Sequence, residues 1–162
     1  MGRKLVVNAS PLIFLAKINQ LSLIKKLSDK TVIPRAVAAE ILRGPESDPA
    51  RQWLQTHGSD HLVELASIQS IITAWDLGQG EAEVIQWAFT HPNYTAVLDD
   101  RAARNCAKAL QVKVVGTIGL ILLAKKERHI IGVSPLLDQL QQAGCRINTD
   151  LLKSAKELAG ED

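Results

Sequence analysis

Cysteine and aromatic residues are scarce in this chain, and their scarcity already excludes several classes of protein. Only 4% of the 162 residues are aromatic, and the two cysteines, Cys106 and Cys145, lie far apart without a CxxC pair or a histidine at ligand spacing. This pattern argues against a disulfide framework or a zinc site, and it is typical of reduced cysteines in a cytosolic protein. With so few aromatics, we expect Trp53, Trp75 and Trp87 to pack in the core or an interface instead of stacking on bases.

Long apolar runs and a strong charge bias are also missing. The longest strongly apolar run, residues 112–124, is interrupted by a lysine, a threonine and two glycines, so it is too short and too punctuated to span a bilayer. The apolar stretch behind the basic N-terminus is broken by polar residues and a proline, which makes it a poor signal peptide. We therefore expect a cytoplasmic protein with no membrane segment. The formal net charge of +2 is too small to indicate nucleic acid by itself.

The chain does contain a regular alternation of short apolar runs and amphipathic stretches. Its length and its hydrophobic share of 46% suit one domain with a substantial core. Ser10-Pro11 is expected to open the first helix with Ser10 as the cap, and Asp48-Pro49 repeats this signature. Strand followed by helix at this spacing predicts a parallel sheet with helices on both faces. Strands are predicted at 5–7, 31–33, 95–98 and 112–115, with a weaker candidate at 62–65, and helices at 21–27, 36–42, 49–53, 81–89, 101–110 and 117–128.

Beyond residue 132 the pattern changes to two helices with no strand between them. They run from Ser134 to Gly144 and from about Asp150 to Leu158. We therefore divide the chain into an α/β part at residues 1–132 and a C-terminal helical extension at residues 133–162 that packs on the same domain. The extension carries more leucine than two short helices can easily bury, which suggests a homodimer. These leucines are Leu136, Leu137, Leu140, Leu151, Leu152 and Leu158.

Acidic and amide side chains stand where the predicted strands end. In open parallel α/β sheets, ligands bind outside the carboxyl ends of the strands. Asn8 ends the first strand, Asp99 and Asp100 end the central one, and Glu81 begins the helix before it. Glu40 lies on a largely apolar helical stretch, where a carboxylate is costly unless it is paired or bound to a cation. These residues are therefore candidates for one polar site.

A purely structural interpretation stays open at this point. Either aspartate can cap the helix that starts at Arg101, and Glu81 can complement the dipole of its own helix. The basic residues that follow, Arg101, Arg104 and Lys108, lie at helical spacing. They suit phosphate contacts beside a pocket, or they form an ordinary solvated helix face.

Four segments, in order along the chain, resemble the motifs of the PIN-domain family. Residues 6–13 (VVNASPLI) look like its opening strand and loop, and residues 33–41 (IPRAVAAEI) resemble its second motif, a helix carrying a glutamate. Residues 80–83 (GEAE) and 98–104 (LDDRAAR) are similar to the third and fourth motifs. The segment from 116 to 152 resembles a subfamily with an added C-terminal helical segment. The resemblance thus covers nearly the whole chain.

The resemblance implies a three-layer α/β sandwich and metal-dependent cleavage of single-stranded RNA. Many members of the family are toxins of the VapC type that a small antitoxin protein holds. Hard oxygen ligands suit Mg²⁺ or Mn²⁺, and such ions activate water for phosphoryl chemistry. By position, the metal ligands that the resemblance implies are Asn8, Glu40, Glu81 and Asp99, and Asp100 is the alternative to Asp99. Ser10 is expected to orient Asn8, the first ligand. The implied catalytic residues are Glu40, Glu81, Asp99 and Asp100.

One departure from the family pattern concerns the first motif, which usually offers an aspartate where this chain has Asn8. Asparagine still offers an oxygen but removes one negative charge from the site. The alternative to a ribonuclease is therefore a catalytically weak PIN-fold module that binds RNA or protein. A flavodoxin-like nucleotide binder is a third, weaker interpretation, because residues 78–80 (GQG) lack the further glycine or lysine of a phosphate loop.

Overall fold

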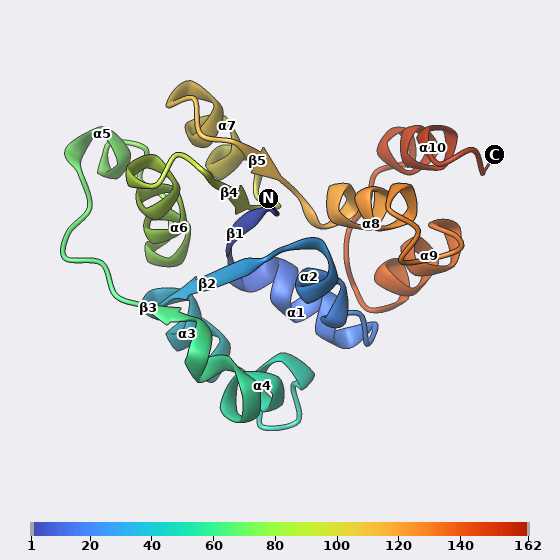
Figure 1. Cartoon of the computed structure of the whole chain (residues 1–162), viewed down its shortest axis with the longest axis horizontal. Coiled ribbons are helices and arrows are strands. Elements are labelled where there is room, and N and C mark those ends of the chain that lie inside the picture. Colours follow the sequence, from blue (N-terminus) through green and yellow to red (C-terminus); the bar gives the residue numbers. More distant parts are fainter. Residues whose placement is uncertain (1, 162) are drawn as a thin grey trace.

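A five-stranded, all-parallel sheet in the order β3-β2-β1-β4-β5 forms the centre of the computed structural model, which describes residues 2–161 (Figure 1). The middle strand, β1, pairs Lys4 with Lys30 on one side and with Tyr94 on the other. This central position buries Leu5, Val6 and Val7 to 1% exposure or less. The strands are β1 (Lys4–Val7), β2 (Lys30–Pro34), β3 (Leu62–Val63), β4 (Tyr94–Val97) and β5 (Val114–Val115).

Helices cover both faces of this sheet, as the sequence predicts. In Figure 1, α6 and α7 lie on one side of the strands, and α1, α2 and α8 on the other. No helix within residues 2–161 is long and apolar enough to cross a membrane. The helices are α1 (Ala9–Lys17), α2 (Ser22–Leu27), α3 (Arg35–Leu42), α4 (Pro49–Trp53), α5 (Ser70–Thr73), α6 (Gln79–Thr90), α7 (Arg101–Ala109), α8 (Thr117–Lys126), α9 (Ser134–Gln142) and α10 (Thr149–Leu158), and a π-helical turn (Leu54–Gly58) and a 3-10 turn (Ser59–His61) follow α4.

Two helix starts test the predicted capping residues, Asp48 and Ser10. Asp48 caps α4 as expected, because its side chain accepts the backbone N–H of Ala50 at 3.3 Å. The prediction that Ser10 caps the first helix is wrong, since α1 begins at Ala9 and Asn8 occupies the N-cap position. Pairing within the sheet explains the difference. The backbone N–H of Asn8 still donates to the carbonyl of Val97 at 3.1 Å, so the chain passes from strand to helix without an intervening loop.

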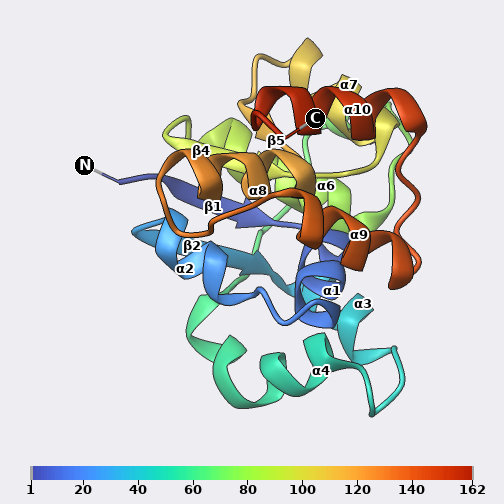
Figure 2. The ribbon, with the colours of Figure 1, turned by 90° about the vertical axis from the view of Figure 1, so that its right-hand side faces the viewer.

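The C-terminal helices pack on the same hydrophobic core as the sheet. Leu136, Leu137 and Leu140 of α9 are at most 6% exposed and belong to the cluster that contains the central strands. Figures 1 and 2 show α9 and α10 beside α8. Half of the extension's leucines are therefore buried within the chain, whereas Leu151 and Leu158 of α10 remain 46% and 78% exposed.

Glu161 fastens the end of the chain to these helices. Its carboxylate accepts the Lys125 ammonium at 2.6 Å and the backbone N–H groups of Val133 and Ser134 at 2.8 and 3.0 Å. It thus caps the first turn of α9 and pairs with a residue of α8. These hydrogen bonds, led by that from Lys125, lower the pKa of Glu161 from 4.5 to about 2.

We expect Glu161→Ala to lower the melting temperature by a few degrees at neutral pH. A folded-state pKa below the ordinary value means that the stabilisation is fully present above about pH 4.5 and is lost as the pH falls toward 2. The difference between variant and wild type should therefore shrink on acidification, as followed by circular dichroism. The control is Glu157→Ala, an exposed residue of α10. An equal effect of the two substitutions would contradict the capping role of Glu161.

Candidate functional site

The carboxyl edge of the sheet gathers the first turns of several helices. Because all the strands are parallel, α1, α3, α7 and α8 each begin where a strand ends, and α6 begins at the same edge before it leads into β4. Helix N-termini carry partial positive charge and free N–H groups. The polar residues predicted from the sequence stand among them, with Asn8 directly after β1 and Asp99 and Asp100 between β4 and α7.

Asn8 is buried at this edge, and its side chain does not cap the helix that it begins. The residue is 6% exposed and forms no side-chain cap hydrogen bond with α1. Its amide oxygen instead faces α6. A Cβ on Gly80 would lie 3.4 Å from that oxygen and 3.3 Å from Cγ2 of Val37. Glycine inside a helix is unfavourable compared with alanine. The short distance between α6 and these two side chains explains why a glycine occupies position 80.

The approach of α6 places Glu81 within electrostatic reach of two other acids. Burial raises the pKa of the Glu81 carboxyl, and the charges of Asp100 and, more weakly, Glu40 raise it further. A hydrogen bond from the backbone N–H of Gly78 to Oε1, at 3.2 Å, opposes these effects. We call Glu40, Glu81 and Asp100 the acidic cluster. Its members come from α3, α6 and the start of α7, so the fold alone brings them together.

The two neighbouring aspartates have different partners. Asp100 caps α7, since Oδ2 accepts the backbone N–H of Ala103 at 3.0 Å. Asp99 turns to the start of α8 instead, where Oδ1 accepts the Thr117 N–H at 2.8 Å and Oδ2 accepts the Thr117 hydroxyl at 2.6 Å. Both oxygens of Asp99 are therefore engaged within the protein. Its charge contributes to raising the pKa of Cys145, after burial, whereas Asp100 acts on Glu81.

The predicted RNA-binding residues lie along α7 beside this edge. Arg101 and Lys108 are exposed, but Arg104 is half-buried and its Nη1 donates to the carbonyl of Leu98 at 3.1 Å. Gly116 makes room for this arrangement, because a Cβ there would lie 2.9 Å from Nη1 of Arg104 and 3.0 Å from Oδ1 of Asp99. Arg104 is thus tied to the end of β4. Ser10, the predicted supporting residue, is half-buried in the first turn of α1.

As the side chains stand, no group of three or more His, Cys, Asp or Glu residues within residues 2–161 is assembled to hold a metal ion. The hydrogen bonds explain this, because Glu81, Asp99 and Asp100 each accept from a nearby N–H group, and like charges repel one another. The donor set nevertheless fits a hard cation. It offers only oxygen ligands, including the buried amide of Asn8. A cation would stabilise the Glu81 carboxylate, whose pKa is raised first by burial and then by the charges of Asp100 and Glu40.

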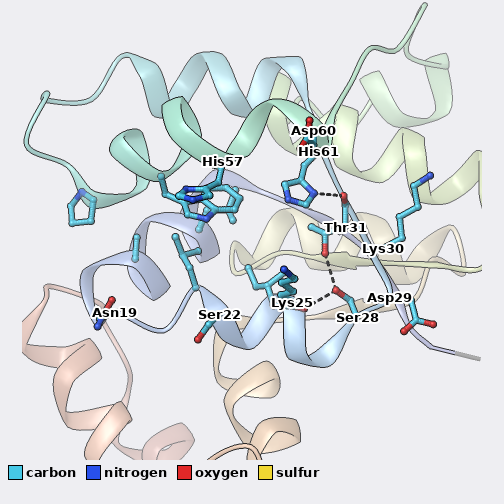
Figure 3. A pocket seen from close by; sticks show the side chains of 16 residues that line it. Asn19, Ser22, Lys25, Ser28, Asp29, Lys30, Thr31, His57, Asp60 and His61 are labelled. Carbon is cyan, nitrogen blue, oxygen red and sulfur yellow. Dashed lines mark hydrogen bonds between the residues drawn. The ribbon is translucent and has the colours of Figure 1, made fainter.

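A hollow of about 720 Å³ lies elsewhere, at the start of β2. Its lining comes from α1, α2 and the segment from α4 to the 3-10 turn (Figure 3). Trp53 stacks on His61 with ring centroids 5.8 Å apart, and Nδ1 of His61 hydrogen-bonds the Thr31 carbonyl at 3.1 Å. Trp53 therefore packs within the protein, as expected. His57 and His61 line this hollow, and none of the predicted site residues does.

Glu83, which the sequence offers as a second acid at the start of α6, has a structural role instead. Its Oε1 accepts the backbone N–H of Ala36 at 3.2 Å, and its Oε2 accepts the side chain of Gln79 at 3.1 Å. It therefore caps α3 across the boundary between two helices. Sequence periodicity gives no signal for such a contact, although the glycines at positions 80 and 116 are signals of close approach.

Comparison with known families agrees with this geometry. The family model that matches the sequence is described as a PIN domain and covers residues 4–161. The chain therefore belongs to the PIN-domain family. This is a nuclease-type fold whose members generally use divalent metals and often bind nucleic acids. A comparison with curated proteins gives no match.

We expect Glu81→Gln to raise the melting temperature in EDTA at pH 7 to 8. The raised pKa means that the ionised carboxylate is disfavoured in the folded state, so its destabilisation is present at high pH and disappears as the pH falls toward the ordinary glutamate range. The advantage of the variant should therefore shrink on acidification to about pH 4. Differential scanning fluorimetry across this range makes the measurement.

Glu83→Gln is the matched control for this prediction, because it also removes one charge from α6. It weakens the cap on α3 and should not stabilise the protein at any pH. If Glu81→Gln lowers the melting temperature at pH 7 to 8 as much as Glu83→Gln does, the electrostatic conflict in the acidic cluster is absent.

Proposed function

We propose that this protein is a metal-dependent endoribonuclease that acts on single-stranded RNA, with Mg²⁺ or Mn²⁺ at the carboxyl edge of the sheet. The observation that carries the proposal is the placement of Glu40, Glu81 and Asp100 at one edge of the sheet, from three different helices. Burial and the charges of Asp100 and Glu40 raise the pKa of Glu81 there. Perturbed carboxyl groups of this kind are common at functional sites, where a cation relieves the repulsion or the shifted group takes part in the chemistry. The buried amide oxygen of Asn8 beside the first turn of α6 adds a neutral ligand.

The proposed ion ligands are Asn8, Glu40, Glu81 and Asp100. Geometry favours Asp100 over Asp99 for direct contact, because both side-chain oxygens of Asp99 accept hydrogen bonds from Thr117 at the start of α8. When bound, a divalent ion supplies an activated water and neutralises charge that develops on the phosphate. Asp99 then serves as a positioning residue for this edge.

The remaining residues would handle the substrate and the protons. Glu81, whose pKa is raised chiefly by burial, is suited to accept or return a proton near the scissile phosphate. Arg101 is exposed in the first turn of α7, and Lys108 lies further along the same helix, so both can contact phosphate oxygens. Arg104 holds the Leu98 carbonyl and offers its remaining N–H groups to the same strand of RNA. Ser10 would orient the oxygen of Asn8.

A second candidate function is a binding module of the same fold that cuts poorly. It is favoured by Asn8, which leaves the acidic cluster with one negative charge fewer than an aspartate would give. The two functions predict the same RNA or protein partner but differ in whether an ion completes the site. The first experiment below therefore alters Asn8 itself.

We also propose two protein partners, a small antitoxin and a second copy of the chain. Support comes from apolar side chains that the fold leaves in water in its C-terminal half, where Ile131 is 99% exposed and Leu158 78% exposed. Side chains of this kind are usually covered by another protein when they gather in one area. A monomer mass by light scattering at micromolar concentration would contradict the homodimer.

Asn8→Asp should tighten the binding of Mn²⁺ by restoring one charge to a partly buried site. The same charge should lower the melting temperature without metal, because it adds to the repulsion around Glu81. Titration calorimetry and fluorimetry in EDTA measure the two effects. Asn8→Ser serves as the control, since it shortens the side chain without adding charge. Equal Mn²⁺ affinities of wild type and Asn8→Asp would mean that residue 8 does not approach the ion.

Wild type should cleave a pooled single-stranded RNA slowly with Mn²⁺ or Mg²⁺ and stop when EDTA is added. Asp100→Asn should remove this activity with little loss of stability, because asparagine caps a helix about as well as aspartate. Asp99→Asn keeps one oxygen acceptor for the Thr117 N–H, and its NH2 group can donate to the Thr117 hydroxyl, so this variant should retain Mn²⁺ binding.

Three other outcomes of this assay have distinct meanings. If Asp99→Asn removes the activity and Asp100→Asn does not, Asp99 is the metal ligand and Asp100 is the positioning residue. Equal cleavage by wild type and both variants would identify a contaminant. RNA binding without cleavage by any preparation would favour the binding module.

A further inference from the structure

The amino edge of the sheet, opposite the acidic cluster, carries a concentration of basic residues. Lys4 and Lys30 are the first residues of neighbouring strands and are paired in register, and Lys113 directly precedes β5. A hollow of about 530 Å³ lies at this edge, and we call it the amino-edge groove. Its charged lining residues are Arg3, Lys4, Lys26, Asp29, Lys113 and Glu127.

The positive charges of the groove are only partly neutralised. Arg3 donates a hydrogen bond to Glu127 and lowers the pKa of that carboxyl, so these two groups remain ionised and cancel each other. Lys4, Lys26 and Lys113 then face a single acid, Asp29. The groove lining therefore carries an excess of two positive charges.

Helix dipoles do not explain this surface completely. Lys26 lies in the last turn of α2, where a cation complements the negative end of the helix. Lys4 and Lys113 lie in or next to strands and belong to no helix. Strands of a parallel sheet have only small net dipoles, so they do not require lysines at their amino ends. The Lys4 ammonium lies over the ring of Tyr94, 5.8 Å from its centroid, a contact that leaves the positive charge uncancelled. The positions of Lys4 and Lys113 therefore suggest an anionic ligand.

We propose that the amino-edge groove binds the phosphate backbone of single-stranded RNA, at a second site separate from the acidic cluster. The inference rests on the proposed RNA substrate. Protein interfaces have an apolar centre, whereas nucleic-acid interfaces are polar and positively charged. The groove matches the second description, because none of its lining residues is an exposed large hydrophobic one, and the side chains of Asn93 and Thr95 add neutral polar groups beside the lysines.

The two edges of the sheet therefore act differently on RNA. The acidic cluster repels phosphate until a cation is bound, whereas the groove attracts phosphate without any metal. Lysine contacts with phosphate carry no sequence information, so this binding is independent of sequence. The groove holds the strand, and the carboxyl edge selects and cuts it. Metal-free binding of RNA is thus the property that separates this site from the catalytic one.

The test is fluorescence anisotropy of a labelled, unstructured single-stranded RNA in EDTA over a series of salt concentrations. Lys26→Glu with Lys113→Glu should weaken binding about tenfold or more and reduce the salt slope by about 1.4, since each phosphate contact on a single strand contributes about 0.7. The control pair, Lys17→Glu with Lys153→Glu, makes the same change in net charge at exposed lysines outside the groove. It should leave the slope unchanged.

A milder pair, Lys26→Gln with Lys113→Gln, removes the two charges without reversing them and is therefore less prone to misfold. It should show the same change in the salt slope with a smaller loss of RNA affinity. Equal affinity and slope for the wild type and both groove variants would overturn the inference. Cleavage with Mn²⁺ is measured separately on the same proteins. If the proteins cleave RNA but the groove variants bind it as tightly as wild type, the nuclease proposal stands and the groove proposal fails. If the groove variants bind RNA more weakly but no protein cleaves it, the groove proposal stands and the nuclease proposal fails.

Discussion

The contact between the first turn of α6 and the end of β1 determines what the carboxyl edge of the sheet can do. Gly80 has no side chain, so the helix comes close to the buried amide of Asn8, and the next residue, Glu81, is carried into the field of Asp100 and Glu40. A Cβ at position 80 would already lie 3.3 Å from Cγ2 of Val37 and 3.4 Å from the Asn8 amide oxygen. The first turn of α6 is therefore packed at contact distance on β1 and α3, and this packing sets the position of Glu81 among the other acids.

The same edge keeps its charges apart through competing hydrogen bonds. Each of the three acids nearest the strand ends is held by the N–H groups of a loop or helix start, so that no ready-made cage of carboxylates exists within residues 2–161. This arrangement lowers the cost of like charges when no ion is present. It also means that an ion would have to compete with these hydrogen bonds, which makes binding weaker and more sensitive to the number of charges in the site.

Sequence reasoning predicted the elements better than the contacts between them. Apolar runs located β1 and β4 within a residue or two, because buried strands need continuous apolar side chains. The short helix α5 was missed, since its four residues have neither a capping signal nor a long apolar face. Ser-Pro commonly opens helices and so predicts Ser10 as a cap, but sheet pairing extends to Asn8, and the helix therefore begins at Ala9.

The candidate site shows the same limit. Strand ends and motif order led to the acids, yet the different partners of Asp99 and Asp100 depend on the position of α8, which local sequence does not encode. The role of Glu83 as a cap of α3 cannot be predicted from local sequence either, because its partner, Ala36, is 47 residues away along the chain.

The separation of charge along the strands has a consequence for how this molecule meets any ion or polymer. A net charge of +2 describes a nearly neutral particle, but the acidic cluster lies at one end of the strands and the lysines of the amino-edge groove lie at the other, which is the charge arrangement of an electric dipole. Such a molecule turns in the field of a charged surface before it touches that surface. Its orientation on first contact is therefore set at a distance, and added salt removes this guidance well before it dissociates close contacts.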